Sequence, residues 1–381
     1  CKYLRICHLN NCATGVATQQ DHLRQEHYIG EPEMLINFFH FIAEETREWL
    51  AALGVAQLKD LIGRTDLLEV LPGDTDKHAH LDLSALLTSH PSAEGKAQYC
   101  QVQGNAPFDK GILAEKMVAE MLPSIEAGQS AEFSFNVVNC DRSIGARISG
   151  EIARRYGNLS MEAHPVVMNL KGTAGQSLGV WNAGGLHIKL EGDANDYVGK
   201  GMAGGRIAIF PPKGSPFQTQ NTAIIGNTCL YGATGGKIYA AGTAGERFAV
   251  RNSGAFAVIE GAGDHCCEYM TGGIVTVLGK VGHNFGAGMT GGFAYVLDLE
   301  NDFVDHYNHE LIELNRISTE AMEEHQTFLL RILDEHIQAT GSAWAYKIRN
   351  EFDYYSRKFW LVKPKAANLQ TLLKTTQADP Q

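Results

Sequence analysis

The first part of the chain has the apolar spacing of helices. Apolar residues recur every three or four positions from Glu33 to Leu53, and Gly54 follows as a stop signal, so this stretch is predicted to be an amphipathic helix. Shorter helical patterns follow at 57–61, 82–87 and 109–122. The polar sequence between Gly95 and Pro107 predicts a domain boundary ahead of the last of these helices.

The pattern changes after Gly172, where helical spacing ends and short alternating apolar runs begin. Aligning the glycines that precede these runs reveals a repeat. The aligned positions are Gly185, Gly205, Gly236, Gly254, Gly273 and Gly292. Their spacings are 20, 31, 18, 19 and 19 residues, and the longest contains the insertion PPKGSPFQTQ. The strands of a sandwich recur every 8 to 12 residues or so, which excludes an ordinary meander.

These repeats predict a β-solenoid in which each repeat forms one coil. Strands of successive coils would pair in parallel, and the glycines would hold left-handed or closely approached backbone at the corners. Six aligned glycines indicate about six or seven coils around a continuous apolar interior. The two ends of such a column need caps.

The last part of the chain is predicted to be helical again. One helix covers roughly Thr319 to Ala339, before Gly341, and a second begins after Ser342 as its N-cap and runs into FDYYSRKFW. The proline in VKPK (362–365) predicts extended backbone. The polar sequence beyond Leu373 predicts a disordered tail.

Composition and charge narrow the class of protein. A net charge of −11 argues against nucleic-acid binding, which needs a basic surface. No apolar run approaches the roughly 18 residues that a membrane span requires. Eight cysteines without a leader sequence favour a reducing, cytoplasmic location. Because the chain begins at Cys1 rather than at methionine, we expect it to be processed or to be a piece of a longer protein.

Three cysteines, Cys1, Cys7 and Cys12, lie within the first twelve residues. Thiolates so close together are candidates for an iron–sulfur cluster, which usually takes four, although a three-iron cluster would need only three. A zinc site would need His8 or a remote ligand. A terminal cysteine could also act as an amidotransferase nucleophile, but that would leave Cys7 and Cys12 unexplained. Unligated thiols are the remaining alternative.

Other motifs are explained better by folding than by chemistry. GKGMAGG and GAGMTGG resemble phosphate loops, but both lead into predicted strands rather than helices, so we interpret them as solenoid corners. Asp76, His78, His80 and Asp82 have metal-ligating side chains in a pattern that is more typical of a solvated loop.

Two further groups of polar residues are assigned to packing and capping. His265, Cys266 and Cys267 cannot all face one site on an extended strand, so packing is the default interpretation. Asp141 or Ser143 is a candidate cap for the helix that follows the strand in FNVVNCDRSIGARISGEIARRYG.

Several long blocks, taken together, resemble one family. CKYLRICHLNNCATGVATQ resembles the iron–sulfur segment of the glutamate synthase large subunit. The blocks KGTAGQSLGVWNAGG, GDANDYVGKGMAGG, IIGNTCLYGATGG, GERFAVRNSGA and CEYMTGG resemble its C-terminal glycine-repeat domain, in the same order. The resemblance runs from Cys1 to about Pro364, and it would make this chain the C-terminal portion of that subunit.

The resemblance implies a fold and an activity. The complete subunit would carry a glutamine-hydrolysing domain, a central domain, an FMN-binding (β/α)8 barrel and a right-handed parallel β-helix. Ammonia from glutamine would combine with 2-oxoglutarate in the barrel, and reduced FMN would deliver hydride to form L-glutamate. Cys1, Cys7 and Cys12 would ligate a [3Fe–4S] cluster that carries electrons to FMN. Many members have proline after the third cysteine, where this chain has Ala13.

The resemblance also implies domains and partners. Residues 1–105 would be the end of the FMN-binding barrel with the cluster loop, 106–315 the right-handed β-helix, and 316–381 a helical segment and tail. A small flavoprotein (beta) subunit with FAD would supply electrons from NADPH, although ferredoxin remains an alternative donor. Without the rest of the barrel, the isolated piece would be inactive.

Two rival functions remain at this point. The first is a purely structural β-helix scaffold subunit of another redox complex, which would have no need for the cysteine segment. The second is a polysaccharide-degrading β-helix enzyme, which predicts a clustered acidic face and a secretion signal, and neither is evident in the sequence.

Overall fold

The structure is a computed structural model that describes most of the 381 residues. The described residues are 10–73, 81–89, 91–93, 95–97, 99–102, 104, 111–157 and 159–373. They form two compact units, one spanning Tyr28–Pro107 and the other combining Cys1–His27 with Phe108–Gln381. None of the helices in the described part of the chain has both the length and the apolarity needed to cross a membrane.

The smaller unit is dominated by one long helix. Helix α2 spans Pro32–Leu53 and ends at Gly54, which has φ 69° and donates its N–H to the carbonyl oxygen of Ala51, so the predicted helix and its stop are confirmed. Most of its apolar side chains, Phe38 and Trp49 among them, are exposed. The remaining elements of this unit are short: η2 (Leu58–Asp60), η3 (Thr65–Leu67), α4 (Ser84–Leu87) and η4 (Pro91–Ala93).

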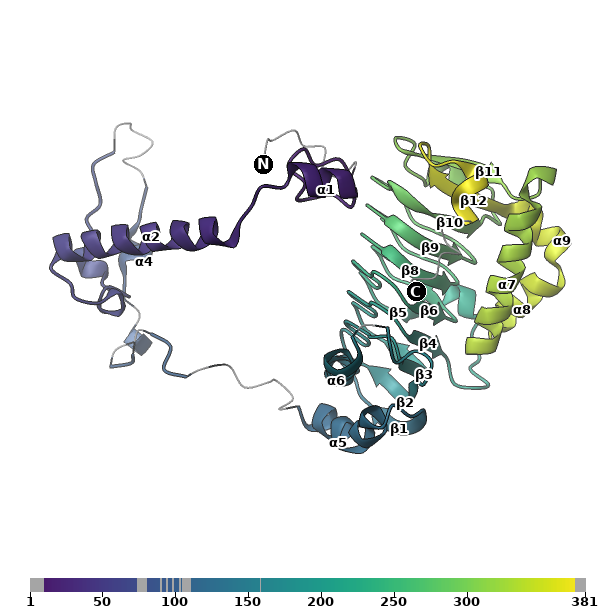
Figure 1. The fold of residues 1–381 in the computed structure, drawn as a ribbon, viewed down its shortest axis with the longest axis horizontal. Coiled ribbons are helices and arrows are strands. Elements are labelled where there is room, and N and C mark those ends of the chain that lie inside the picture. Colours follow the sequence, from purple (N-terminus) through teal and green to yellow (C-terminus); the bar gives the residue numbers. More distant parts are fainter. Residues whose placement is uncertain are drawn as a thin grey trace. The chain divides into compact units, whose positions relative to one another are not determined.

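The larger unit is a β-solenoid of parallel strands stacked in chain order (Figure 1). Seven consecutive parallel strand pairings run from β1 to β10. They confirm the predicted solenoid of about six or seven coils. Its strands are β1 (Ala131–Val137), β2 (Val166–Ala174), β3 (Leu186–Ala194), β4 (Arg206–Phe210), β6 (Lys237–Ala240), β8 (Ser253–Ile259), β9 (Thr271–Val277) and β10 (Gly291–Leu297).

Apolar side chains stack in columns inside the solenoid because the strands pair in register. Ile188 on β3 pairs with Ile207 on β4, which in turn pairs with Ile238 on β6, and all three are fully buried. The predicted insertion follows β4 and runs into η5 (Thr219–Asn221). β5 (Ala223–Ile225) then rejoins the column by pairing with β3 and β7 (Thr243–Ala244).

The corners of the solenoid have an unusual backbone that links each coil to both neighbours. His265, Cys267 and Tyr269 are all left-handed, with φ of 62°, 58° and 53°. The N–H of His265 donates to the carbonyl oxygen of His283 in the next coil at 2.8 Å, whereas that of Cys267 donates to Phe248 in the preceding coil at 2.8 Å. Left-handed residues alternate in the same way at 177, 179 and 181; 197, 199 and 201; 228, 230 and 232; 247, 249 and 251; and 284, 286 and 288.

This backbone explains the two similar glycine motifs. In GKGMAGG, Gly199 and Gly201 occupy two of the left-handed corner positions, and in GAGMTGG, Gly286 and Gly288 do the same. Each motif leads into a strand. The prediction that they are solenoid corners is therefore confirmed. By contrast, the expectation that residues 265–267 form an extended strand is wrong. They lie at a solenoid corner, where His265 and Cys267 have left-handed backbone.

The predicted repeat glycines touch the coil beneath them. A Cβ atom added at Gly205 would lie 2.3 Å from the carbonyl oxygen of Leu186, and one added at Gly254 would lie 2.2 Å from that of Thr234. Neither distance is possible for a real side chain. The repeat glycines are therefore required by the close stacking of coils, as the sequence predicted.

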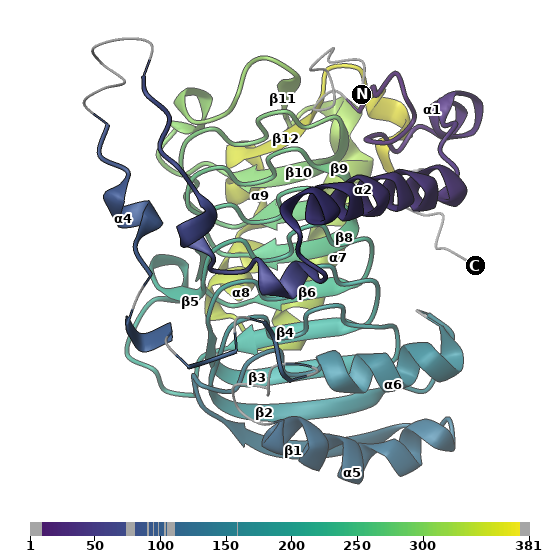
Figure 2. The same cartoon turned by 90° about the vertical axis from the view of Figure 1, so that its left-hand side faces the viewer.

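Two helices and the strand β1 close the first end of the solenoid (Figure 2). Helix α5 spans Ile112–Glu126 and α6 spans Ala146–Tyr156, and their apolar faces join the solenoid core through Met121, Ile125, Ile148 and Ile152. A side-chain cap for α6 was predicted at Asp141 or Ser143, and this is wrong.

The N-cap of α6 is Gly145, and no side chain bonds to the cap. Ser143 is left-handed, with φ 52°, and its N–H donates to Gln176, so it belongs to the first solenoid corner. The carboxylate of Asp141 instead accepts the N–H of Val138 at 2.8 Å. Ser143 and Asp141 are therefore engaged in hydrogen bonds of the first solenoid corner and its loop, rather than in capping α6.

An antiparallel pair of strands closes the other end. β12 (Phe359–Pro364) pairs antiparallel with β10 on one side and with β11 (Ile312–Arg316) on the other. The prediction of extended backbone at VKPK is confirmed, but the helix predicted to run through Phe359 and Trp360 is wrong. The unpaired edge of β10 supplies hydrogen-bond partners that outweigh helix propensity there.

Helices from the C-terminal segment cover the outer face of the sheet (Figure 1). Phe328, Leu329 and Ile332 of α7 pack against outward side chains such as Tyr239 and Tyr295. The elements of this segment are η6 (Phe303–Asp305), η7 (Glu320–Met322), α7 (Glu323–Thr340), α8 (Ala343–Asn350), α9 (Phe352–Tyr355), η8 (Ser356–Lys358) and η9 (Leu369–Thr371). The tail predicted beyond Leu373 lies outside the described residues.

The junction between α7 and α8 is attached to the solenoid by buried polar groups. Ser342 is the N-cap of α8, as predicted, and its hydroxyl oxygen accepts the N–H of Ala345 at 3.0 Å. The same hydroxyl donates to the carboxylate of Glu260, which also contacts Nε2 of His336 at 3.3 Å. Glu260 and His336 are fully buried, so this contact is shielded from bulk solvent.

Candidate metal centre

Only one of the three predicted cluster ligands lies within the described residues. Cys1 and Cys7 lie outside them, and Cys12 lies inside. The side chain of Cys12 is buried, in a loop that precedes helix α1 (Asp21–His27). The loop turns sharply after Cys12, since the N–H of Gly15 donates to the Cys12 carbonyl oxygen at 3.0 Å.

The Cys12 sulfur lies next to hydrogen-bonding groups of its own loop. The hydroxyl of Thr14 lies 3.2 Å from Sγ. The Thr14 hydroxyl is the largest cause of a lowered pKa, followed by the backbone amides of Ala17 and Thr14, and together they bring the pKa of the Cys12 thiol to about 6. Burial of the sulfur acts in the opposite direction. The thiolate is the form that binds iron, so this environment fits a metal ligand.

A second set of hydrogen bonds closes this loop at Asn10. Asn10 is left-handed, with φ 55°. Its carbonyl oxygen accepts the hydroxyl of Thr18 at 2.7 Å and Nε2 of Gln20 at 2.6 Å. Its side-chain oxygen accepts the N–H of Gln19 at 2.6 Å. The residues 10–20, which we call the cysteine loop, therefore form a ring closed by Asn10.

Sequence reasoning identified Cys12 but missed Asn10, Thr14 and Thr18. Two signals were present in the sequence. Asparagine tolerates left-handed backbone more readily than most residues, and Thr and Asn side chains often bond to nearby backbone. Neither signal says which donors meet the sulfur, because that depends on how the loop closes.

The other cysteines of the solenoid are packed into its core. The sulfur atoms of Cys266 and Cys267 lie 3.8 Å apart, and both residues are buried. Burial raises the pKa of the Cys267 thiol well above its usual range and that of Cys229 to about 12. The predicted packing role is confirmed for Cys266 and Cys267, whereas His265 is partly exposed. Buried thiols held in this form are poor nucleophiles and poor metal ligands.

The histidine-containing loop is only partly within reach. Asp76, His78 and His80 lie outside the described residues. The carboxylate of Asp82 accepts the N–H of Ser84 at 2.9 Å, at the start of α4. Across the described stretches of the chain, no group of three or more His, Cys, Asp or Glu side chains is arranged to hold a metal ion.

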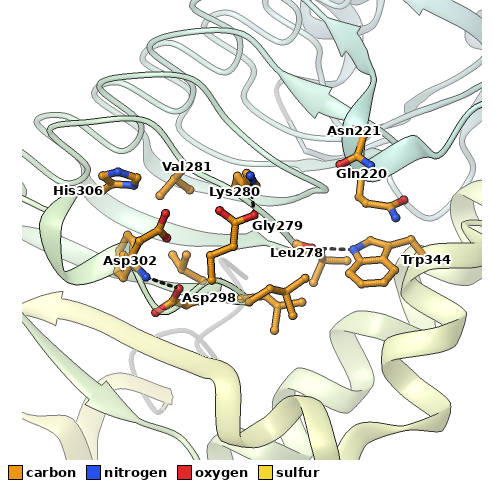
Figure 3. A pocket seen from close by; sticks show the side chains of 15 residues that line it. Gln220, Asn221, Leu278, Gly279, Lys280, Val281, Asp298, Asp302, His306 and Trp344 are labelled. Atoms are coloured by element: carbon orange, nitrogen blue, oxygen red, sulfur yellow. Dashed lines mark hydrogen bonds and ion pairs between the residues drawn. The ribbon is translucent and has the colours of Figure 1, made fainter.

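A cleft of about 200 Å³ lies where the last coils meet the C-terminal helices (Figure 3). It is lined by the residues that follow β9, by the end of β10 and the turn after it, by η5 and η6, and by the start of α8. The indole N–H of Trp344 donates across it to the carbonyl oxygen of Leu278 at 2.7 Å.

Two charged groups of this cleft bind each other, and a third is held by N–H donors. Lys280 and Glu300 form an ion pair at 2.6 Å. The buried carboxylate of Asp298 accepts the indole N–H of Trp360 at 2.9 Å and the N–H of Asp302 at 3.1 Å. The bonds of Trp344 and Trp360 attach the C-terminal segment to the solenoid, and the Lys280–Glu300 pair joins the turns of two successive coils. We assign all of them a structural role.

Comparison with known proteins gives one family match for the solenoid and another for the cysteine loop. Residues 114–365 match the GXGXG motif family, and residues 1–56 match the conserved region in glutamate synthase. The first match covers the solenoid and its C-terminal closure, and the second covers the cysteine loop.

Individual relatives agree with these matches. The chain is 48% identical over 96% of its length to ferredoxin-dependent glutamate synthase 2 of Synechocystis sp.. It is 44% identical to the glutamate synthase [NADPH] large chain of Azospirillum brasilense, and 43% identical to glutamate synthase [NADH] of Schizosaccharomyces pombe, in each case over 96% of its length. It spans 23%, 24% and 17% of these relatives, respectively. The chain therefore belongs to the GXGXG motif family, and it is similar over 96% of its length to these glutamate synthases.

Proposed function

We propose that this chain acts as the C-terminal part of a glutamate synthase large subunit. The complete enzyme makes L-glutamate from L-glutamine and 2-oxoglutarate by reductive transfer of the amide nitrogen. The observation that carries the proposal is the cysteine loop, which lies in the stretch matching the glutamate synthase region and places hydrogen-bonding groups next to the Cys12 sulfur.

Cys1, Cys7 and Cys12 are the proposed ligands of a [3Fe–4S] cluster. Such a cluster accepts and releases single electrons. The described residues contribute a prepared thiolate: the Thr14 hydroxyl and nearby amides hold the negative charge on Cys12, and Asn10 keeps the loop closed. Burial of Cys12 also limits access of water and oxidants to this sulfur.

The solenoid has a different role, which is to be a rigid scaffold. Its coils are joined at every corner by backbone bonds in both directions, and the buried side chains form a continuous core. We assign residues 106–315 to this scaffold, 1–105 to the end of an FMN-binding barrel, and 316–381 to a helical segment with its tail. The exposed apolar side chains of α2 agree with a helix that packs against the rest of such a barrel.

Partners and cofactors follow from this assignment. FMN and the amidotransferase site would belong to upstream domains of the same polypeptide, in the cytoplasm. We propose NADPH as the electron source, through FAD in a small flavoprotein (beta) subunit, in line with the name of the Azospirillum relative. Ferredoxin is the competing donor, and the names of other relatives support it. Steady-state assays of the complete enzyme with each donor separate the two.

A purely structural scaffold is the second candidate function. The cleft beside Trp344 favours it, because the polar groups there bond to one another and hold the elements of the solenoid together. A scaffold role leaves the hydrogen-bonding groups next to Cys12 without a purpose.

Iron analysis of the complete subunit tests the proposal. After anaerobic reconstitution, the complete subunit is expected to hold about three iron atoms per chain in this cluster, and Cys12→Ala is expected to lose them. Cys140→Ala is the matched control, because Cys140 is an exposed thiol outside the cysteine loop. A complete subunit that binds no iron, or a Cys12→Ala variant that keeps a full cluster, would refute the cluster assignment.

A further inference from the structure

We propose that Thr14 is a positioning residue that sets the reduction potential of the cluster bound through Cys12. The inference rests on the proposed function, which makes Cys12 a ligand, and goes beyond it by assigning a role to a side chain that binds no iron. It also assigns to Asn10 the role of holding Thr14 in position.

The geometry of the sulfur supports a donor role for Thr14. Its hydroxyl oxygen lies 3.2 Å from Cys12 Sγ. A cysteine sulfur bound to iron has no proton to give, so in the loaded protein the hydroxyl is the donor of this bond. The two residues are separated only by Ala13, and the turn closed by Gly15 folds the hydroxyl back onto the sulfur.

A donor on a ligand sulfur changes the energy of the two oxidation states differently. The reduced cluster carries one more negative charge than the oxidised cluster. A hydrogen bond to the thiolate therefore stabilises the reduced form more, which raises the reduction potential. Loss of the Thr14 hydroxyl is accordingly expected to make the cluster harder to reduce.

The closed loop keeps the Thr14 hydroxyl at this distance. Asn10 accepts bonds from Thr18, Gln19 and Gln20, so both ends of the loop are attached to one residue. Thr18 has the same side chain as Thr14 but gives its hydroxyl to the Asn10 carbonyl oxygen at 2.7 Å. The chain thus contains a matched pair of threonines, one on the sulfur and one on the loop closure.

Redox potentiometry of the complete subunit, followed by EPR of the cluster, tests the inference. Thr14→Val removes the hydroxyl and keeps the shape of the side chain. It is expected to retain iron and to shift the midpoint potential to a more negative value. Thr14→Ser is expected to restore the wild-type potential. Thr46→Val is the control, because the Thr46 hydroxyl donates to the carbonyl oxygen of Ile42 within helix α2, outside the cysteine loop, and it is expected to leave the potential unchanged.

The outcomes separate this inference from the proposed function. An unchanged potential in Thr14→Val with an intact cluster would overturn the inference and leave the cluster assignment standing. If Thr14→Val loses its iron, Thr14→Ser decides: recovery of both iron and potential supports the role of the hydroxyl, and failure to recover refutes it. Absence of iron in the wild-type subunit refutes the proposed function itself.

Discussion

Gly205 shows how a single atom can oppose the stacking of coils. It has φ 71°, and an added Cβ would lie 2.3 Å from the carbonyl oxygen of Leu186 and 2.5 Å from Nδ2 of Asn182. Both neighbours are fixed, since the first is backbone and the second is a buried amide bonded to three carbonyl oxygens. Neither can move without opening the contact between two coils.

We therefore expect Gly205→Ala to destabilise the fold by about 3 kcal/mol or more, because it adds a backbone clash to the cost of left-handed alanine. Gly232→Ala is the matched control. Gly232 is also left-handed, with φ 62°, but an added Cβ would meet no atom within 4 Å, so about 1 kcal/mol is expected. Denaturant unfolding of both variants measures the difference, and equal losses would contradict the clash.

The sequence predicted where glycines hold the special backbone of the solenoid. It did not predict which other residues adopt left-handed backbone. The spacing of Gly205 and its counterparts revealed the repeat because glycine is the only residue that fits. Tyr269 and Cys267 occupy equally left-handed positions, and nothing in their chemistry indicates this. Their conformation is imposed by the hydrogen bonds between coils, which no local rule contains.

The junction of α7 and α8 illustrates what an element gains from its neighbours. As an isolated helix end, Ser342 caps α8 through the N–H of Ala345. In the folded protein it also donates to the buried carboxylate of Glu260. Loss of its hydroxyl thus leaves a buried carboxyl group with one fewer hydrogen-bond partner as well as an uncapped helix.

We expect Ser342→Ala to cost about 2 to 4 kcal/mol, which exceeds the roughly 1 kcal/mol of an ordinary N-cap. In a Glu260→Gln background the cost is expected to be smaller, because the carboxyl group that accepts the Ser342 hydroxyl is gone. A double-mutant cycle on the free energy of unfolding measures this coupling. Strictly additive effects would show that the two side chains act independently.

At the level of elements, the sequence predicted helices well where they end at strong signals. Gly54 and Gly341 end α2 and α7, and both have left-handed backbone. It failed where an element is defined by a partner far away in the chain. Phe359 and Trp360 form a strand because β10 leaves an edge to be filled, and their helical spacing carries no information about that edge.

The molecule as a whole has an acid-sensitive cap at the first end of the solenoid. Glu151 on α6 is buried and bonded to Arg147, Arg154 and Arg155. Hydrogen bonds from Arg147 and then Arg155 are the main causes that lower the pKa of Glu151 to about 2, from an ordinary value of 4.5. A lowered pKa means that the folded state prefers the charged carboxylate.

The stabilisation from Glu151 should therefore be complete above about pH 4.5 and disappear as the pH falls towards 2. We expect Glu151→Gln to be less stable than wild type at pH 7 and the difference to shrink across this window. Glu300→Gln is the control, since its ion pair with Lys280 is exposed and is worth little. Thermal melts between pH 2 and about pH 7 measure the difference in stability between wild type and Glu151→Gln. A difference that stays constant across this range would contradict the prediction.

The architecture of the whole molecule was predictable, and the candidate metal centre was predictable only in part. A regular glycine spacing predicts a column of coils, because each coil needs a glycine at the point where its backbone contacts the neighbouring coil. The cysteine loop occurs once, so its closure by Asn10 and its donor Thr14 follow from a single arrangement of side chains that no repeat reveals.

The antiparallel closure by β12 and β11 determines where the column stops. A solenoid of parallel strands ends in an edge on which the same strand of another copy could be added, and then another. At β10 that edge is occupied by a strand running the opposite way, and the short β11 beyond it carries Glu313 and Arg316 among its five residues. The closure therefore acts as a terminator that keeps a repetitive sequence from growing into a fibre.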